Sequence, residues 1–284
     1  MTARIDVPSG FNFVSTVISH GWYLLAPFRW SAEERVLRRV ELLGGKPVEI
    51  AISFDGRALV VAGARDTAEL RAKLARMFQL GVDIGEFAAL AIESPEHVWV
   101  VQAGFGRLLC GATLFEDVAK IIATTNTTWT QTKRMVQFVV EKCGRGGTFP
   151  TPADVVRFSM DELQRDCRLG YRAKTLHALA TGIADGSIDV ARIADPSQST
   201  EELFRSYRAL PGIGPYGAAH LLAMDGRHDF IAVDTEFRRF VRETYHKGRR
   251  VADATMLRRY RKWGRWKYLA YWSELWHSID RLAL

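Results

Sequence analysis

Apolar and polar positions follow a strand pattern in the first quarter of the chain. The segment Val36–Leu43 leads to a pair of glycines, and Val48–Phe54 then alternates apolar with small or polar residues. Asp55-Gly56 is a typical hairpin sequence, and the apolar run Ala58–Ala62 follows it. The pattern therefore predicts an antiparallel meander over residues 35–64.

Helical spacing dominates the rest of the chain. Leu70, Leu74 and Phe78 recur at helical intervals within 68–80, and helical spacing continues throughout from about residue 105. The main helices expected there are Leu114–Ala123, Trp129–Lys142, Arg172–Ala184, Glu201–Arg208, Pro215–Met224, Thr235–Tyr245 and 254–284. We therefore expect an α+β fold, with a small antiparallel sheet followed by a mostly α-helical part.

Three regions follow from these patterns. Residues 1–100 are predicted to form an N-terminal antiparallel sheet domain, and residues 101–250 a helical domain. Residues 251–284 are predicted to form a C-terminal helix that packs across the junction between the two domains. Its aromatic residues suit such an interface: Trp263, Trp266, Tyr268, Tyr271, Trp272 and Trp276.

Composition places the chain among ordinary globular proteins. It has 284 residues, of which 48% are hydrophobic and 25% charged. No apolar run is long enough to span a membrane, and the N-terminus lacks the pattern of a signal peptide. We expect no membrane association and a cytoplasmic location, at the nucleoid if the source is a bacterium.

The three cysteines exclude several chemistries. Cys110, Cys143 and Cys167 show no CxxC spacing and cannot supply the four thiolates of an iron–sulfur cluster. They are too few for a disulfide framework. We expect free thiols, no iron–sulfur cluster and no metal ion.

The positive charge is concentrated near the C-terminus. The net charge is +7, and twelve basic residues lie between Arg238 and Lys267 with only Glu243 and Asp253 against them. Such asymmetry favours a polyanionic partner, although many globular proteins have a basic surface without one.

The most informative motif joins two predicted helices. Leu210–Ala219 reads LPGIGPYGAA. Gly212 and Gly214 allow a tight turn whose backbone N–H groups can approach an anion, close to the positive end of the next helix. Ile213 is expected to point inward and join the helices, and Pro211 completes the turn. The motif predicts a clamp for a DNA phosphate; the alternative is a helical hairpin that uses glycines only to turn.

A carboxylate follows the hairpin at a helix start. Asp234 ends the apolar run 231–233 and precedes the helix Thr235–Tyr245. Its simplest role is an N-cap, which accepts hydrogen bonds from the first amides of the helix. The helix dipole and these amides would also keep the carboxylate ionised. An ionised carboxylate can stabilise the cationic sugar that forms as a glycosidic bond breaks, so Asp234 is the candidate catalytic residue.

These motifs resemble a known family. LPGIGPYGAA followed by VDT is similar to the signature of the helix-hairpin-helix (HhH-GPD) DNA glycosylases. Residues 123–129 resemble the asparagine-containing turn of the 8-oxoguanine DNA glycosylases, and LGYRAK at 169–174 resembles their LGYRA motif. The resemblance implies that Asn126 fills the gap left by a flipped nucleotide, Tyr171 wedges the base stack, and Arg172 contacts the partner base. Asn126 could instead be a plain turn or cap residue, and Tyr171 could simply cover a helix end.

The chain departs from the 8-oxoguanine enzymes directly after the hairpin. Tyr216 occupies the position of their attacking lysine, so the usual Schiff base cannot form. An aromatic residue there resembles the 3-methyladenine glycosylases. We expect Tyr216, Trp129, Trp272 and Trp276 to form a base pocket, although tryptophans on helices more often lie in the core.

The resulting hypothesis is a monofunctional DNA glycosylase acting on damaged, alkylated purines in double-stranded DNA by base flipping. Alternatives are a glycosylase for oxidised guanine, with lyase activity through another amine such as Lys133 or Lys174, and a non-catalytic DNA-binding module. The resemblance implies no organic cofactor and allows a monovalent cation at the hairpin carbonyls. We expect a monomer whose partner is double-stranded DNA containing a damaged base.

Overall fold

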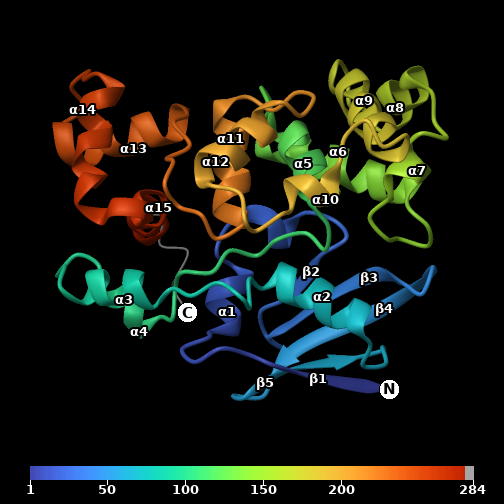
Figure 1. Cartoon of the computed structure of the whole chain (residues 1–284), viewed down its shortest axis with the longest axis horizontal. Helices are drawn as coiled ribbons and strands as arrows, with labels where there is room; N and C mark the ends of the chain where they lie inside the picture. Colours follow the sequence, from blue (N-terminus) through green and yellow to red (C-terminus); the bar gives the residue numbers. More distant parts are fainter. Residues whose placement is uncertain (279–284) are drawn as a thin grey trace.

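The computed structural model describes residues 1–278 and has an antiparallel sheet of five strands at the N-terminus (Figure 1). The strands are β1 (Thr2–Asp6), β2 (Arg29–Ser31), β3 (Val36–Leu43), β4 (Lys46–Phe54) and β5 (Ala58–Ala62). Their order is β1-β5-β4-β3-β2, and every neighbouring pair is antiparallel. The predicted α+β class and the meander β3-β4-β5 are confirmed. The strands β1 and β2 at the two edges were not predicted.

The sheet packs against short N-terminal helices and α2. These elements are α1 (Phe13–Val17), the 3₁₀ turn η1 (Gly21–Leu24) and α2 (Ala68–Met77). Thr67 caps α2 by accepting a hydrogen bond from the Leu70 N–H, and the apolar side of α2, with Leu70 and Leu74, is fully buried. The helix predicted at 68–80 is therefore present as α2 and covers the sheet. Its Lys73 Nζ also donates a hydrogen bond to the Leu42 carbonyl near the end of β3.

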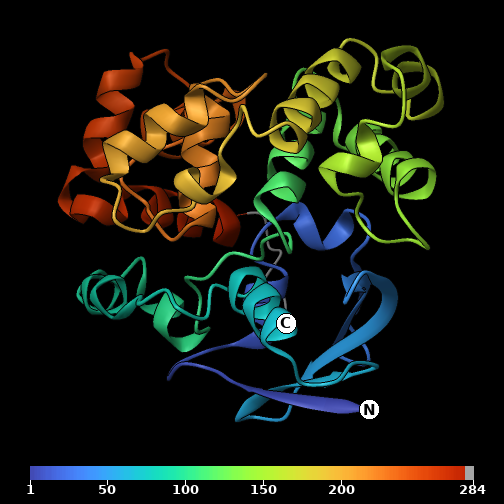
Figure 2. The same cartoon turned by 45° about the vertical axis from the view of Figure 1, so that its right-hand side comes forward.

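The remaining elements within residues 1–278 are helices joined by loops. The helices are α3 (Gly85–Ile92), α4 (Val98–Gln102), α5 (Leu114–Thr124), α6 (Trp129–Cys143), α7 (Pro152–Val155), α8 (Met160–Asp166), α9 (Arg172–Ala184), α10 (Val190–Ile193), α11 (Thr200–Arg208), α12 (Pro215–Met224), α13 (Thr235–His246), α14 (Asp253–Arg258), the 3₁₀ segment η2 (Arg259–Trp266) and α15 (Lys267–Ser278). Two views show α5 to α15 on one side of the molecule, with the sheet and α2 on the other (Figures 1 and 2). None of the helices within residues 1–278 has the length and apolar character needed to cross a membrane.

The C-terminal segment is not the single helix that its aromatic pattern predicts. Gly264 has φ 54° and ψ −123°, which breaks the helical path between α14 and α15. The last part of the predicted helix, 279–284, lies outside the described residues. Within the described part, α15 contacts the N-terminal region through a hydrogen bond of 2.9 Å that the Trp272 Nε1 donates to the Ser19 carbonyl. The division of the chain into domains at residues 100 and 250 stays a prediction.

A buried charge network joins the sheet to the helices. Arg39 of β3 makes two hydrogen bonds to the Glu116 carboxylate of α5, at 2.9 and 3.2 Å, and Lys120 donates to the same group at 2.7 Å. All three side chains are buried. Buried charges need such partners, because an isolated one would lose its hydration without compensation. The network therefore holds α5 in a defined position over β3.

Candidate active site

The hairpin between α11 and α12 has the backbone that its glycines predict. Gly212 has φ 74°, and a Cβ atom there would lie 2.3 Å from the Thr175 Cγ2, so both conformation and space require glycine. Ile213 is buried, as predicted. Gly214 is exposed at the N-cap of α12, and an added Cβ would meet no protein atom within 4 Å. An external group can therefore approach the backbone at Gly214.

A cavity of about 190 Å³ lies between α12, α15 and the start of α13. It is lined by Gly21, Tyr216, His220, Ala232, Asp234, Glu236, Tyr268, Tyr271, Trp272, Leu275 and Trp276. The predicted residues Asp234, Tyr216, Trp272 and Trp276 therefore share one cavity, although they come from three different helices or helix starts. Packing of the C-terminal helix beside the hairpin brings them together.

Asp234 is both a helix cap and a cavity residue. Its Oδ1 accepts a hydrogen bond from the Phe237 N–H at 2.7 Å, which makes it the N-cap of α13. Burial raises the pKa of this carboxyl above its ordinary value, and the hydrogen bond from Phe237 opposes the rise. The helix start therefore favours the charged form, as expected, but desolvation by the cavity walls has the larger effect. The two readings of Asp234 from the sequence do not exclude each other.

The cavity walls are stacked aromatic rings. Tyr268 and Trp272 are stacked with ring centroids 5.8 Å apart and planes 9° apart, and the Trp272 and Trp276 rings lie 6.4 Å apart. Tyr216 lies one turn before His220 on α12, and the centroids of their stacked rings are 6.0 Å apart. Flat apolar walls of this kind can hold a planar ring system between them.

Several lining residues were not predicted from the sequence. His220 accepts from or donates to the Tyr268 hydroxyl through Nδ1 at 3.0 Å, and burial lowers the pKa of its imidazole to about 4. His220 lies one helical turn after Tyr216, so helical spacing from the predicted site could have found it. Glu236 lies two residues after Asp234, an interval that does not place both on one helix face, and only the structure shows that it lines the cavity. Tyr268 and Tyr271 carried no comparable signal, because the whole segment is aromatic.

The prediction that Trp129 lines the base pocket is wrong. Its side chain is partly exposed on α6 and is absent from the cavity lining. The ring packs against Gly21, where an added Cβ would lie 2.6 Å from the Trp129 Cζ2. Gly21 itself lines the cavity, so Trp129 lies next to the cavity wall without being part of it.

The asparagine turn lies beside the start of α9. Asn126 has φ 46°, and its Nδ2 donates to the Tyr171 hydroxyl at 3.3 Å. The Tyr171 side chain is 60% exposed, which suits a residue that inserts into a base stack. Arg172 is instead buried, and its guanidinium donates to the Thr125 and Asn126 carbonyls and stacks on the Tyr171 ring. In this structure Arg172 holds the turn and Tyr171 in place, and with Asn126 and Tyr171 it lines a second, surface cavity. Its contact with a partner base stays a prediction.

Comparison with known proteins agrees with the geometry. The model of the HhH-GPD superfamily of base excision DNA repair proteins matches residues 119–265. No curated protein matches the chain in sequence. The family match confirms the resemblance seen in the sequence and, with it, the predicted enzyme class, a DNA N-glycosylase.

Solved structures share the fold over almost the whole chain. The 3-methyladenine DNA-glycosylase from Archaeoglobus fulgidus has a TM-score of 0.77 at 19% identity, covering 98% of this chain and 99% of that one. The 8-oxoguanine glycosylase/lyase from Clostridium acetobutylicum, in complex with double-stranded DNA, has a TM-score of 0.75 at 19% identity, covering 99% and 98%. At these identities the likeness establishes the fold alone.

The matched region contains the hairpin, Asp234 and Tyr216, and it spans about half of the chain. The chain therefore belongs to the HhH-GPD superfamily of base excision DNA repair proteins.

Proposed function

We propose that this protein is a monofunctional DNA glycosylase that releases alkylated, positively charged purines from double-stranded DNA. One observation carries the proposal: the cavity combines aromatic walls with the carboxylates of Asp234 and Glu236, and neither lysine nor arginine within residues 1–278 is among its lining residues. Alkylation of a purine ring nitrogen gives the base a positive charge. Aromatic faces and carboxylates both attract such a cation, whereas neutral oxidised guanine gains less from them.

The same charge explains how the reaction can proceed in this cavity. A cationic base leaves the sugar as a neutral molecule, so its departure needs no proton from the enzyme. His220 suits this mechanism, because burial lowers the pKa of its imidazole to about 4 and keeps it neutral near pH 7. Asp234 would be ionised, stabilise the cationic sugar and orient the attacking water. The products would be the free base and an abasic site.

The absence of lysine in the lining supports hydrolysis without strand cleavage. Tyr216 replaces the amine that forms a Schiff base in bifunctional enzymes, and a phenol cannot take its place. Lys133 and Lys174, the alternative amines, are exposed on α6 and α9 and do not line the cavity.

DNA binding would use both predicted surfaces. The open backbone at Gly214 would contact a phosphate, while Tyr171 and Asn126 would enter the duplex near the flipped nucleotide. The Clostridium acetobutylicum enzyme of the same fold was solved with double-stranded DNA. A monovalent cation at the hairpin carbonyls, the lack of any organic cofactor and a monomeric state remain parts of the proposal.

Oxidised guanine is the second candidate substrate. The placement of Asn126 beside Tyr171 favours it, because these positions match the motifs of the 8-oxoguanine enzymes. A non-catalytic clamp is disfavoured, because a clamp has no use for a carboxylate in an aromatic cavity beside the hairpin.

Base release from a panel of duplexes tests the proposal. The duplexes would carry 7-methylguanine, 3-methyladenine or 8-oxoguanine, and mass spectrometry would detect the free base. We expect release of the methylated purines, little release of 8-oxoguanine, and no DNA adduct after borohydride treatment. Release of 8-oxoguanine alone, or a borohydride-trapped adduct, would contradict the proposal.

A further inference from the structure

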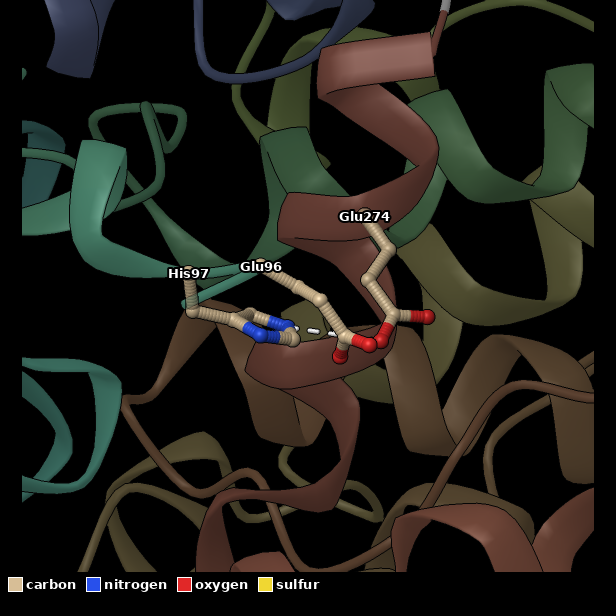
Figure 3. A group of neighbouring side chains, drawn as sticks. All are labelled: Glu96, His97 and Glu274. Atoms are coloured by element: carbon tan, nitrogen blue, oxygen red, sulfur yellow. Dashed lines mark ion pairs between the residues drawn. The ribbon is translucent and has the colours of Figure 1, made fainter. Parts of the chain in front are cut away.

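A cluster of three possible metal ligands lies outside the cavity, between α4 and α15 (Figure 3). Glu96 and His97 directly precede α4, and Glu274 lies on α15. One ligand atom from each residue lies within 4.8 Å of the others, and the His97 Nε2 is 3.4 Å from the Glu274 Oε1. These residues are far apart in the sequence, so no metal-ligand spacing could reveal them.

The imidazole of His97 is buried and oriented toward the carboxylate. Its side chain is 0% exposed, its Nδ1 lies 3.1 Å from the Ser94 hydroxyl, and the Glu274 carboxylate is the group that faces its Nε2. If Nδ1 donates to Ser94, the lone pair of Nε2 faces a carboxylate oxygen. Two acceptors in contact repel each other unless a proton or a metal ion lies between them. Metal-binding histidines show this arrangement, with the outer nitrogen held by a second hydrogen bond.

The Glu274 carboxylate is held in a similar way. Its Oε2 accepts a hydrogen bond from the Tyr260 hydroxyl at 2.7 Å, which leaves Oε1 toward His97. The Arg259 Nη2 lies 3.7 Å from the Glu274 carboxylate and 3.8 Å from that of Glu96, too far for a hydrogen bond to either. Two carboxylates and one guanidinium leave a net negative charge beside the imidazole, which attracts a divalent cation.

We propose that His97, Glu274 and Glu96 bind a zinc ion. Ligands about 2.0–2.2 Å from a tetrahedral zinc lie roughly 3.3–3.6 Å apart, and the His97–Glu274 separation falls within this range. Glu96, whose side chain is 63% exposed, would close the third position, and water would take the fourth. A nitrogen ligand favours zinc over magnesium, which prefers oxygen ligands alone.

The ion would connect the segment before α4 to the helix that carries Trp272 and Trp276. Glu274 lies between these two residues in the sequence, and they line the base cavity. The site would therefore stabilise the position of this cavity wall without touching the substrate. Its role is structural and independent of which base the enzyme removes.

Calorimetric titration of chelator-treated full-length protein with Zn²⁺ tests the proposal. We expect one ion per chain, a higher melting temperature with Zn²⁺, and no comparable effect of Mg²⁺. Glu96→Gln should lower the affinity at least tenfold and should fold normally, because this side chain is exposed. The matched control is Glu93→Gln, an exposed neighbour outside the cluster, which should bind as the wild type does.

Two further variants test the inner part of the site. His97→Gln should abolish binding, and Ser94→Ala should weaken it about 10–100-fold, as loss of an outer hydrogen bond does at other metal sites. Co²⁺ bound at this site should show no thiolate-to-cobalt absorption.

Absence of binding by the wild type would mean that His97 and Glu274 form a plain ion pair. Unchanged binding by both Glu96→Gln and His97→Gln would place the ion elsewhere, for instance at Cys143 and Cys167, whose sulfur atoms lie 3.9 Å apart. Either result would overturn the proposal.

Discussion

Asp234 illustrates how one residue can satisfy a structural and a chemical requirement together. As an N-cap it satisfies the Phe237 N–H of α13, and as a lining residue it exposes carboxylate to the cavity. An asparagine side chain can cap a helix nearly as well as an aspartate, but it has no charge to stabilise a cationic sugar. The two roles can therefore be separated by one substitution.

Asp234→Asn should reduce single-turnover base release by a factor on the order of a hundred or more, because it removes one strong electrostatic stabiliser of the transition state. Stability should be unchanged or slightly higher. The pKa of Asp234 is raised in the folded state, so its ionised form destabilises the fold at neutral pH, and an uncharged side chain removes this effect. Rapid-quench kinetics and thermal unfolding measure the two quantities. A folded variant that releases base at the wild-type rate would leave Asp234 as a cap only.

The pH dependence of base release follows from the same carboxyl. Only ionised Asp234 can stabilise the sugar cation, so the rate should fall as pH falls through its raised pKa, above the ordinary aspartate value of about 3.9. His220 also titrates in acid, with a pKa lowered to about 4, so His220→Gln serves as the control and should keep the acid limb. An acid limb that disappears in His220→Gln would assign the limb to the histidine.

At the level of elements, the α11–α12 hairpin separates two kinds of glycine. Gly212 is required by the fold for two reasons. A side chain there would clash with Thr175, and the backbone has a positive φ that other residues rarely adopt. Gly214 is not required by the fold, since its φ is −84° and the space around an added Cβ is open. If the protein needs glycine at position 214, the reason must therefore be contact with an external partner. A substitution of Gly214 tests whether that partner is DNA.

Gly214→Val should leave stability within about 1 kcal/mol of the wild type, as most exposed substitutions do. It should weaken binding to every duplex alike, because it blocks the approach of a phosphate without touching a base. Fluorescence anisotropy with several sequences measures this. The control is Gly81→Val, another glycine with open space around an added Cβ and no positive φ, in the loop between α2 and α3. Equal affinity of both variants would exclude Gly214 from the interface.

At the scale of the whole molecule, buried charges connect the sheet to the helices. Burial alone would raise the pKa of Glu116, but Arg39 and Lys120 outweigh it and lower the pKa to about 2. Removal of this anion would leave two cations buried without their common partner. The connection between the two parts of the protein therefore depends on charge as well as on apolar packing.

Glu116→Gln should destabilise the protein by about 3–5 kcal/mol, the usual effect of breaking a buried ion pair. Because the folded pKa is depressed, this stabilisation is present above the unfolded value of about 4.3 and is lost as pH falls toward 2. Urea unfolding at neutral and acidic pH should show that the difference in stability between Glu116→Gln and the wild type becomes smaller in acid.

The control is Glu49→Gln, which breaks the exposed pair with Arg29 and should change stability by about 1 kcal/mol or less. Equal effects of the two substitutions would contradict this account.

The basic C-terminal stretch is less cationic than its sequence suggests. Four of the twelve basic residues in 238–267 form ion pairs with carboxylates of residues 1–278: Arg238, Arg239, Arg259 and Arg265. The remaining basic residues are still enough for several phosphate contacts. Affinity for DNA should therefore fall roughly tenfold to a thousandfold between low and moderate salt, and a salt-independent affinity would exclude phosphate contacts as its main source.

Local motifs allowed much of the fold and part of the site to be predicted. The meander, the hairpin and the start of α13 depend on turn and cap residues within a few positions of each other, and glycine, proline and aspartate have the same local effect in any fold. The hairpin motif and Asp234 were found for this reason. The edge strands β1 and β2 and the break at Gly264 were missed, because short strands and single glycines give little periodic signal.

The cavity itself was decided by tertiary structure. An aromatic residue on a helix has the same spacing whether it lies in the core, behind a wall or in a pocket, so Trp129 and Trp272 could not be distinguished by pattern. Only the packing of α15 beside α12 placed Trp272, Tyr268 and His220 around Asp234 and left Trp129 outside. The sequence by itself determined the local backbone and the candidate carboxylate. The position of that carboxylate in a desolvated aromatic cavity depends on contacts between residues far apart in the chain, which no local pattern records.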